Sequence, residues 1–311
     1  MRDRNIYIKL SQYFIILIAY LYLIYYIFNF KDWQSFIEKF IYADNIQYLY
    51  LFFAVILFTI NILFEAIKWK YLLNDIQYIS LKNAIKQTYF GIVGGFFTPA
   101  KLGDFPSRVT MINDKNKWIT AISLGFIGSF TLSFVQIIIG FSSFFIYLFY
   151  SSNLKNVNYI ILFYIIVILI FIFLIIYYKK IALFFSNKIN NYSLKNTFYI
   201  LSEFSYKKLL NTCLLSFLRY IVYCTQFYLL LLFCGVDLTL YEAFICISVY
   251  YMFITITPNL PFADVGIRGS LSVIIFSIFT QNTIGVMVAA ILLWIINNVF
   301  PMIIGSIEKK Q

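Results

Sequence analysis

Long apolar runs alternate with short polar segments along the chain and predict six membrane-spanning helices. Each run reaches or approaches the roughly 20 residues that cross about 30 Å of hydrocarbon as a helix. The runs cover residues 10–30, 46–64, 118–149, 158–178, 209–234 and 282–305. We therefore expect an all-α polytopic membrane protein with a single transmembrane domain over residues 1–311.

Two further apolar regions, 82–112 and 241–280, contain helix-breaking residues near their centres. Proline removes a backbone donor and glycine weakens a helix, so each region divides into two short limbs. We interpret both regions as re-entrant hairpins. The expected helix breaks are Gly94, Gly95, Pro99 and Gly103 in the first region and Pro258, Pro261, Gly266 and Gly269 in the second.

The composition supports a membrane protein rather than a soluble one. Apolar residues make up 62% of the chain and charged residues 12%, against about 45–50% and about 25% in soluble domains. The formal net charge of +11 comes from residues placed between the apolar runs. They form no continuous basic face, so we expect no nucleic-acid partner.

Lysine and arginine collect on one side of the predicted topology. A cytoplasmic N-terminus puts 19 of the 24 Lys and Arg residues in cytoplasmic segments, as the positive-inside rule requires. Each hairpin then returns to its own side, the first opening to the cytoplasm and the second to the outside. We expect a multi-pass cell-membrane protein with both termini cytoplasmic and inverted halves at about 10–150 and 158–305, as in many transporters.

A short sequence similarity between the two hairpins supports the inverted repeat. In each, a Thr-Pro pair precedes glycine, aspartate and arginine, and the proline and arginine are separated by a similar distance. The matching residues are Thr98, Pro99, Gly103, Asp104 and Arg108 in the first hairpin and Thr257, Pro258, Asp264, Gly266 and Arg268 in the second.

Several kinds of chemistry are excluded by the residues present. The chain has no histidine, which excludes Ser-His-Asp catalysis and His-ligated metal sites. Its four cysteines lack zinc-site spacing and are interpreted as small apolar side chains. No phosphate-binding loop or nucleophile-elbow motif occurs. We expect no catalytic residue, metal or cofactor.

The broken helices predict a polar cavity that suits an anion. Non-helical backbone persists at membrane depth only where protein buries it or water reaches it. Helix N-termini and cationic side chains facing such a cavity favour a phosphate group. The predicted substrate-binding residues are Lys101, Asp104, Arg108, Arg219, Asp264 and Arg268.

The acidic members of this set have two possible roles. Asp104 and Asp264 either pair with an arginine and keep the breaks rigid, or take part in proton coupling or contact a cationic headgroup. Arg219 lies near the middle of a predicted span and needs an acidic partner, for which we expect Asp104 or Asp264. Its role is either structural or substrate-binding. Tyr223 and Gln226 extend its polar stripe.

Other charged residues receive simpler interpretations. Glu65, Lys68 and Lys70 follow the second predicted span and are expected to be interfacial anchors at its cytoplasmic end. The segment 179–208 contains six lysines. It is either an amphipathic connector along anionic lipid or a solvated loop.

The segment Pro99–Arg108, PAKLGDFPSR, resembles the P-x-R-x-G-[E/D]-x-x-R signature of the lysylphosphatidylglycerol synthase transmembrane (flippase-like) family. The proline-led stretch 258–269 resembles its second signature, and the resemblance covers about 10–305. It implies two opposed re-entrant regions and, in fused members, translocation of an aminoacylated phospholipid. Two departures limit it: residues 123–129 lack an acidic-basic pair that the family often has, and the soluble aminoacyl-transferring domain is absent from this sequence.

These observations favour a translocase for an anionic lipid or lipid-linked amphiphile, with no enzymatic step. The alternatives are a membrane-embedded transferase that acts on a lipid-phosphate-linked sugar, with Asp104 or Asp264 as general base, and a non-catalytic partner in a lipid or polysaccharide pathway. The expected partners are membrane lipids with an anionic headgroup and a separate synthase or glycosyltransferase.

Overall fold

The computed structural model describes residues 21, 45–74, 76–112, 114–151, 157–257 and 264–307. These residues form helices joined by short turns, and no strand occurs among them. In chain order the elements are α3 (Asn45–Leu73), α4 (Leu81–Phe96), η1 (Pro99–Lys101), α5 (Asp104–Val109), η2 (Lys115–Lys117), α6 (Trp118–Ser151), α7 (Val157–Lys188), α8 (Tyr192–Glu203), α9 (Tyr206–Phe233), α10 (Leu240–Ile256), α11 (Asp264–Phe276), α12 (Thr283–Trp294), η3 (Ile295–Val299) and α13 (Phe300–Ile307).

Four helical segments are long and apolar enough to cross a membrane, which confirms the all-helical membrane class. They are α3, most of α6, α9, and the continuous segment Thr283–Ile307 formed by α12, η3 and α13. Helix α7 has 32 residues and begins where the span at 158–178 was predicted. The predicted span at 10–30 lies outside the described residues except for Leu21.

Helix α3 continues to Leu73, well beyond the predicted boundary at residue 64. The added turns place Glu65 and Lys68 inside the protein, where they are 6% and 2% exposed. The interpretation of these two residues as interfacial anchors is therefore wrong. Apolar residues on the same turns, such as Trp69 and Leu72, are also buried, so the helix continues because it packs against protein.

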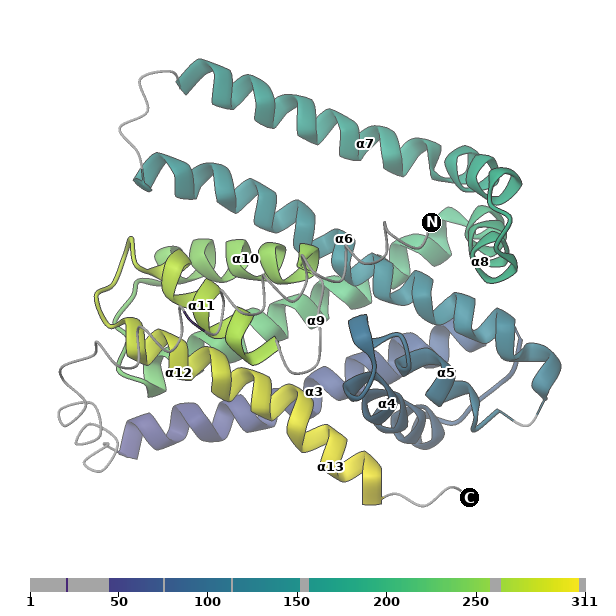
Figure 1. Ribbon diagram of the computed structural model, residues 1–311, viewed down its shortest axis with the longest axis horizontal. Coiled ribbons are helices and arrows are strands. Elements are labelled where there is room, and N and C mark those ends of the chain that lie inside the picture. Colours follow the sequence, from purple (N-terminus) through teal and green to yellow (C-terminus); the bar gives the residue numbers. More distant parts are fainter. Residues whose placement is uncertain are drawn as a thin grey trace.

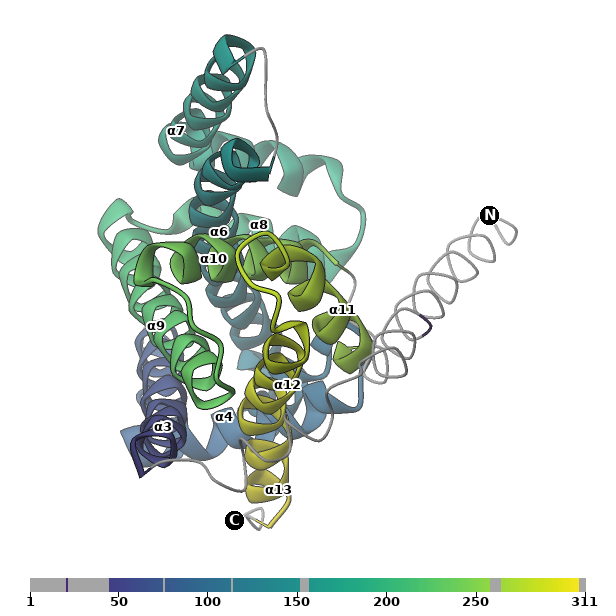
Figure 2. The same cartoon turned by 90° about the vertical axis from the view of Figure 1, so that its left-hand side faces the viewer.

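Each of the two hairpin regions begins and ends at the same end of the molecule. In the first, Ile79 before α4 and Ile112 after α5 belong to one hydrophobic cluster. In the second, the Asn282 side chain donates a 2.9 Å hydrogen bond to the Gly235 carbonyl, joining the turn before α10 to the turn after α11. Figure 1 shows α4 and α5 at the right of the bundle and the ends of α10 and α11 at the left, and Figure 2 shows α10 and α11 in front of the more distant α4.

The first break lies after the predicted glycines. Helix α4 passes through Gly94 and Gly95, and the chain leaves it at Phe97. Two non-glycine residues, Ala100 (φ 51°) and Lys101 (φ 56°), then adopt the left-handed conformation. Pro99 lies at this break and Gly103 precedes α5, as predicted.

Four of the predicted glycine breaks are wrong, because Gly94 and Gly95 lie within α4 and Gly266 and Gly269 within α11. Gly94 has a packing role instead. A Cβ there would lie 2.7 Å from the Gly103 carbonyl oxygen, so only glycine lets α4 approach the start of α5 this closely. Pro258 and Pro261 lie outside the described residues.

Each broken helix pair packs against a helix from the other half of the chain. Helix α4 packs against α13, and α10 packs against α6. A glycine allows close approach at each contact: a Cβ on Gly305 would lie 2.7 Å from the Tyr89 carbonyl oxygen, and a Cβ on Gly140 would lie 2.6 Å from the Ser248 carbonyl oxygen. Helices α3 and α9 pack along each other and complete the link between the halves.

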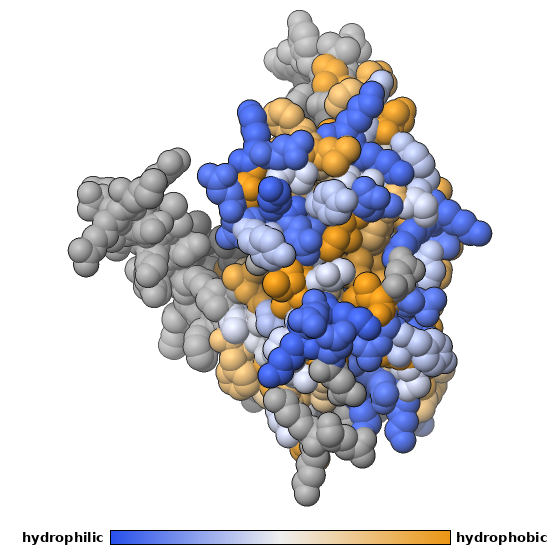
Figure 3. Space-filling model, turned by 90° about the vertical axis from the view of Figure 1, so that its right-hand side faces the viewer, coloured by the Kyte–Doolittle hydropathy of each residue, from blue (hydrophilic) through white to orange (hydrophobic). Residues whose placement is uncertain are grey.

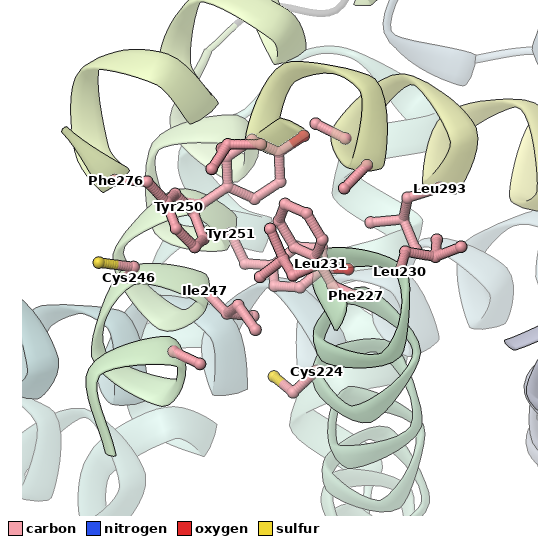
Figure 4. Close-up of a cluster of buried hydrophobic side chains, with 14 of the residues drawn as sticks. Cys224, Phe227, Leu230, Leu231, Cys246, Ile247, Tyr250, Tyr251, Phe276 and Leu293 are labelled. Atoms are coloured by element: carbon pink, nitrogen blue, oxygen red, sulfur yellow. The ribbon is translucent and has the colours of Figure 1, made fainter. Parts of the chain in front are cut away.

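The larger apolar core lies among α9, α10, α11 and α12 (Figure 4). Phe227, Tyr250 and Phe276 meet at its centre, with ring centroids 5.1 Å apart for Phe227 and Tyr250 and 5.6 Å for Phe227 and Phe276. Cys224 and Cys246 are free thiols buried in this core, as expected for small apolar side chains.

Hydrophilic side chains gather at the end of the molecule that carries α8 and the connections beside α4 and α5 (Figure 3). Lys82, Lys115 and Lys195 are exposed in this region. The segment 179–208 is helical in α8, which packs against α6 and α7. It is therefore a helical connector rather than a solvated loop, and its position along anionic lipid stays a prediction.

Candidate functional site

A cavity of about 440 Å³ lies where the breaks of the two hairpin regions meet. Ala100 and Lys101 line it from the first region, and Ile256 and Thr257 from the second. Helices α3, α6, α9 and α12 and the segment η3 supply the other walls. The volume falls within the range of about 300–1,000 Å³ typical of small-ligand sites.

The structure gathers the predicted substrate-binding residues around this cavity. Five of them line it: Lys101, Asp104, Arg108, Arg219 and Arg268. The sixth, Asp264, lies directly behind Arg268, to which it is bonded.

Glu65 is the central anion of the first half of the site. Its carboxylate pairs with Arg108 at 2.9 Å, with Lys68 at 3.0 Å and with Arg219. Lys68 also donates to the Gly128 carbonyl of α6 at 3.0 Å. One carboxylate thus compensates cations from α3, α5 and α9.

The predicted partner of Arg219 is therefore wrong: Arg219 pairs with Glu65, and neither aspartate is its partner. It also donates to the Tyr223 hydroxyl at 3.0 Å and to the Asn61 side-chain oxygen at 2.6 Å. The expected extension of its polar stripe through Tyr223 is thus observed.

Each hairpin region carries its own aspartate–arginine pair at the start of its second limb. Asp104 is the first residue of α5 and receives two hydrogen bonds from Arg108, at 2.6 and 3.1 Å. Asp264 is the first residue of α11 and pairs with Arg268 at 2.8 Å. In both pairs the aspartate and the arginine are four residues apart, so each aspartate pairs with an arginine of its own region. This pairing corresponds to the structural role that the sequence suggested for the aspartates.

Thr98 and Thr257, which occupy matching positions in the two hairpin regions, make equivalent hydrogen bonds. Thr98 donates to the Gly94 carbonyl at 3.0 Å, and Thr257 donates to the Phe253 carbonyl at 2.7 Å. Both bonds reach four residues back and satisfy a carbonyl at the end of the first limb. Thr98 in addition accepts from the Gly103 amide at 2.8 Å and so bridges the first break.

Lys101 is the cation least compensated by acids. Its ammonium donates to the Asn298 side-chain oxygen at 2.8 Å, and among the described residues it has no carboxylate within ion-pair distance. The residue is exposed and left-handed. A strained backbone position of this kind is typical of functional sites.

Carboxamides connect the site to the last helix. Asn61 donates to Asn297 at 3.0 Å, and Asn297 donates to Gln226 at 2.8 Å. Asn297 and its neighbour Asn298 lie in η3, a π-helical turn. Such turns widen the helix locally and are frequent at functional sites.

Three of the helices that line the cavity carry polar residues at i, i+4 and i+7, a stripe on one helical face. Only the α9 stripe was recognised in the sequence. The same spacing in apolar surroundings could have revealed the other two. The stripes are Asn61, Glu65 and Lys68 on α3, Ser129, Ser133 and Gln136 on α6, and Arg219, Tyr223 and Gln226 on α9.

Among the described residues, positive charge exceeds negative charge around the cavity. Five cations and three acids line it or pair with the lining residues, a formal excess of two positive charges. The cations are Lys68, Lys101, Arg108, Arg219 and Arg268, and the acids are Glu65, Asp104 and Asp264. Burial makes unbalanced charge costly, so an anion from outside would complete the site.

No group of side chains suited to holding a metal ion occurs within the part of the chain that the structure describes.

The sequence over residues 13–305 matches the family model described as the lysylphosphatidylglycerol synthase TM region. The chain belongs to this family. Membership confirms the family resemblance seen in the sequence. With the apolar helices, it makes the chain a multi-pass membrane protein connected with lipid metabolism or transport. Searches of curated proteins and of solved structures give no match.

For a member of the lysylphosphatidylglycerol synthase TM family, the position of the signature residues is informative. Asp104 and Arg108 close the first break and connect it through Glu65 to α9. The signature segment therefore forms one wall of a charged cavity.

Proposed function

We propose that this protein translocates an anionic lipid or lipid-linked amphiphile, with the headgroup held in the cavity between the two hairpin regions. The excess positive charge at the meeting point of the two breaks is the observation that carries the proposal. Arginine matches the geometry of phosphate oxygens, and Lys101 adds a cation without an acidic partner among the described residues.

The order of the elements supports an inverted repeat, an arrangement found in many transporters. The order span, broken pair, span occurs as α3, α4–α5, α6 and again as α9, α10–α11, α12–α13. The aspartate–arginine pairs and the exchanged glycine contacts correspond between the halves. Repeats of this kind place a substrate site at their interface, and we interpret both broken pairs as re-entrant hairpins.

The exposed part of the cavity suits a lipid. Lys101, Ser129 and Ile256 line it and are exposed. Ser129 lies about 16 Å along α6 from Trp118, near the middle of a bilayer about 30 Å thick. A headgroup could enter there from the side while its acyl chains stay in hydrocarbon.

The aspartates are better suited to structure than to catalysis. Asp104 and Asp264 each accept from an arginine, and Asp264 also accepts from the Trp294 indole at 2.8 Å. Neither is free to act as a general base, so we favour a protein that moves its lipid unchanged over a transferase. A separate synthase or glycosyltransferase would make the lipid.

Reconstitution into liposomes tests the proposal. Fluorescent phosphatidylglycerol is placed in both leaflets, and a membrane-impermeant reductant destroys the outer label. We expect the protein to accelerate loss of the protected inner signal, and Arg268→Gln to slow that loss. Thr225→Ala is the matched control, because Thr225 is exposed on α9 and, among the described residues, its hydroxyl bonds to a carbonyl of its own helix.

Folded protein that accelerates no anionic lipid would contradict the proposal. Mass spectrometry of the recovered lipids separates the alternative: a change in lipid mass indicates a transferase. A loss-of-function phenotype that survives joint substitution of Asp104, Arg108 and Arg268 would instead indicate a non-catalytic partner.

A further inference from the structure

The polar groups of the described residues that keep hydrogen-bonding capacity in the cavity are hydroxyls, an amide and the ammonium of Lys101, which donates only one of its hydrogens, to Asn298. Ser129 and Ser133 make no hydrogen bond through their hydroxyls to the described residues. Gln136 accepts from Thr255 at 2.9 Å, which leaves its amide nitrogen to donate. These three side chains lie on one face of α6.

Aromatic rings form another wall. Trp294 is held by its bond to Asp264 and packs on Phe96 at a centroid distance of 6.1 Å. Tyr223 accepts from Arg219 and keeps its own proton to donate. A flat apolar face beside hydroxyl and amide groups matches a sugar or cyclitol ring, whose C–H face is apolar and whose rim carries hydroxyls.

The carboxylates leave no place for a cationic headgroup. Glu65 is paired with three cations, and Asp104 and Asp264 each with an arginine. An ammonium in the cavity would have to displace one of these cations or add to the positive excess. Either outcome costs free energy in a buried site.

We infer that the headgroup is a phosphate that carries an uncharged polyhydroxylated ring, and that a cationic aminoacyl headgroup is disfavoured. Lys101, with Arg268, meets the phosphate, and the α6 stripe with Trp294 meets the ring. This inference rests on the proposed function, since it names the lipid class that the cavity would carry.

Competition for labelled phosphatidylinositol on the purified protein tests the binding preference without requiring transport. The competitors are unlabelled phosphatidylinositol, a polyprenyl-phosphate hexose, phosphatidic acid and lysylphosphatidylglycerol. The two ring-bearing lipids should compete at least about threefold more strongly than lysylphosphatidylglycerol, and their ranking distinguishes a cyclitol from a sugar. Equal or stronger competition by lysylphosphatidylglycerol overturns the inference.

Substitutions on α6 test which residues contact the ring of the headgroup. Loss of one neutral hydrogen bond weakens binding between about twofold and tenfold. Gln136→Leu and Ser133→Ala should do so for the ring-bearing lipids and leave phosphatidic acid unchanged, whereas Thr225→Ala changes neither. Thr255 keeps its bond to the Tyr251 carbonyl in the Gln136 variant, which protects the fold. An equal loss of phosphatidic acid binding would show that α6 does not contact the ring.

The liposome assay separates this inference from the proposed function. If the protein prefers ring-bearing lipids in binding but translocates no lipid, the proposed translocase function is overturned and the inferred headgroup is kept. If the protein translocates lipids but prefers lysylphosphatidylglycerol, the proposed translocase function is kept and the inferred headgroup is overturned.

Discussion

Glu65 of α3 and Arg219 of α9 form a buried ion pair that joins the two halves of the chain. Arg108 of α5 shares the same carboxylate, so the first hairpin region is held by the same contact. A single acidic residue therefore connects a span of each half with the signature segment. Its removal would leave three cations buried around a neutral group.

We expect Glu65→Gln to destabilise the protein by about 3–5 kcal/mol, the usual cost of removing one partner from a buried ion pair. The measurement is thermal unfolding of the protein in detergent. Glu242→Gln is the control, because Glu242 is the N3 residue of the α10 capping box and glutamine can keep its bond to Thr239, so the change should cost less than about 1 kcal/mol. Equal midpoints for the two variants would show that Glu65 is not central to the network.

Gly140→Ala and Gly305→Ala should each destabilise the protein by about 1–3 kcal/mol, because the new methyl group would overlap backbone oxygens of a facing helix. Gly95→Ala is the milder comparison: its Cβ would lie 3.2 Å from Asp104 Cβ. The same unfolding assay ranks the three. A Gly95 variant as unstable as the other two contradicts the close approach at the exchanged contacts.

Lys101→Gln should weaken binding of phosphatidic acid by about tenfold or more, the effect of losing a hydrogen bond to a charged group. Its stability should stay unchanged, because the ammonium pairs with the neutral Asn298. Lys101→Arg should retain most of the binding. Lys117→Gln controls for net charge, since Lys117 lies in η2 and its side chain is 40% exposed. Unaltered binding by Lys101→Gln would remove this residue from the site.

Surface labelling tests the proposed orientation. In a variant whose four cysteines are replaced by alanine, Gln281→Cys should react with an impermeant maleimide on intact cells. Asn116→Cys should react only after permeabilisation, because Lys115 and Lys117 flank it and basic segments stay in the cytoplasm. Both residues are exposed, so access to the reagent is comparable. Reversed labelling would invert the topology.

Helices and the first break could be predicted from the sequence more accurately than the pairing of charged residues. Apolar length located α6 and α9 to within a few residues, and proline located the first break. Glu65 was misplaced because a hydropathy boundary stops at the first charge, whereas the helix continues wherever its charges find partners inside the protein.

The glycines illustrate the same limit. A glycine such as Gly94 in a hydrophobic stretch indicates either a break or a close contact between helices. The choice depends on the facing backbone, which is distant in sequence. For the site, the cations of the hairpin regions could be predicted. The spacing of the α6 stripe is also visible in the sequence, but what the stripe faces depends on the packing of α6 beside α10.

The exchanged contacts also set an order for biosynthesis. Tyr89 of α4 packs against Gly305 of α13, which the ribosome adds about two hundred residues later. Until then the first hairpin region lacks this neighbour, whereas Arg219 of α9, which shares Glu65 with the arginine of that region, is added earlier. The signature segment is among the first parts of the site to be made, yet it can reach its final packing only when the last helix has entered the membrane.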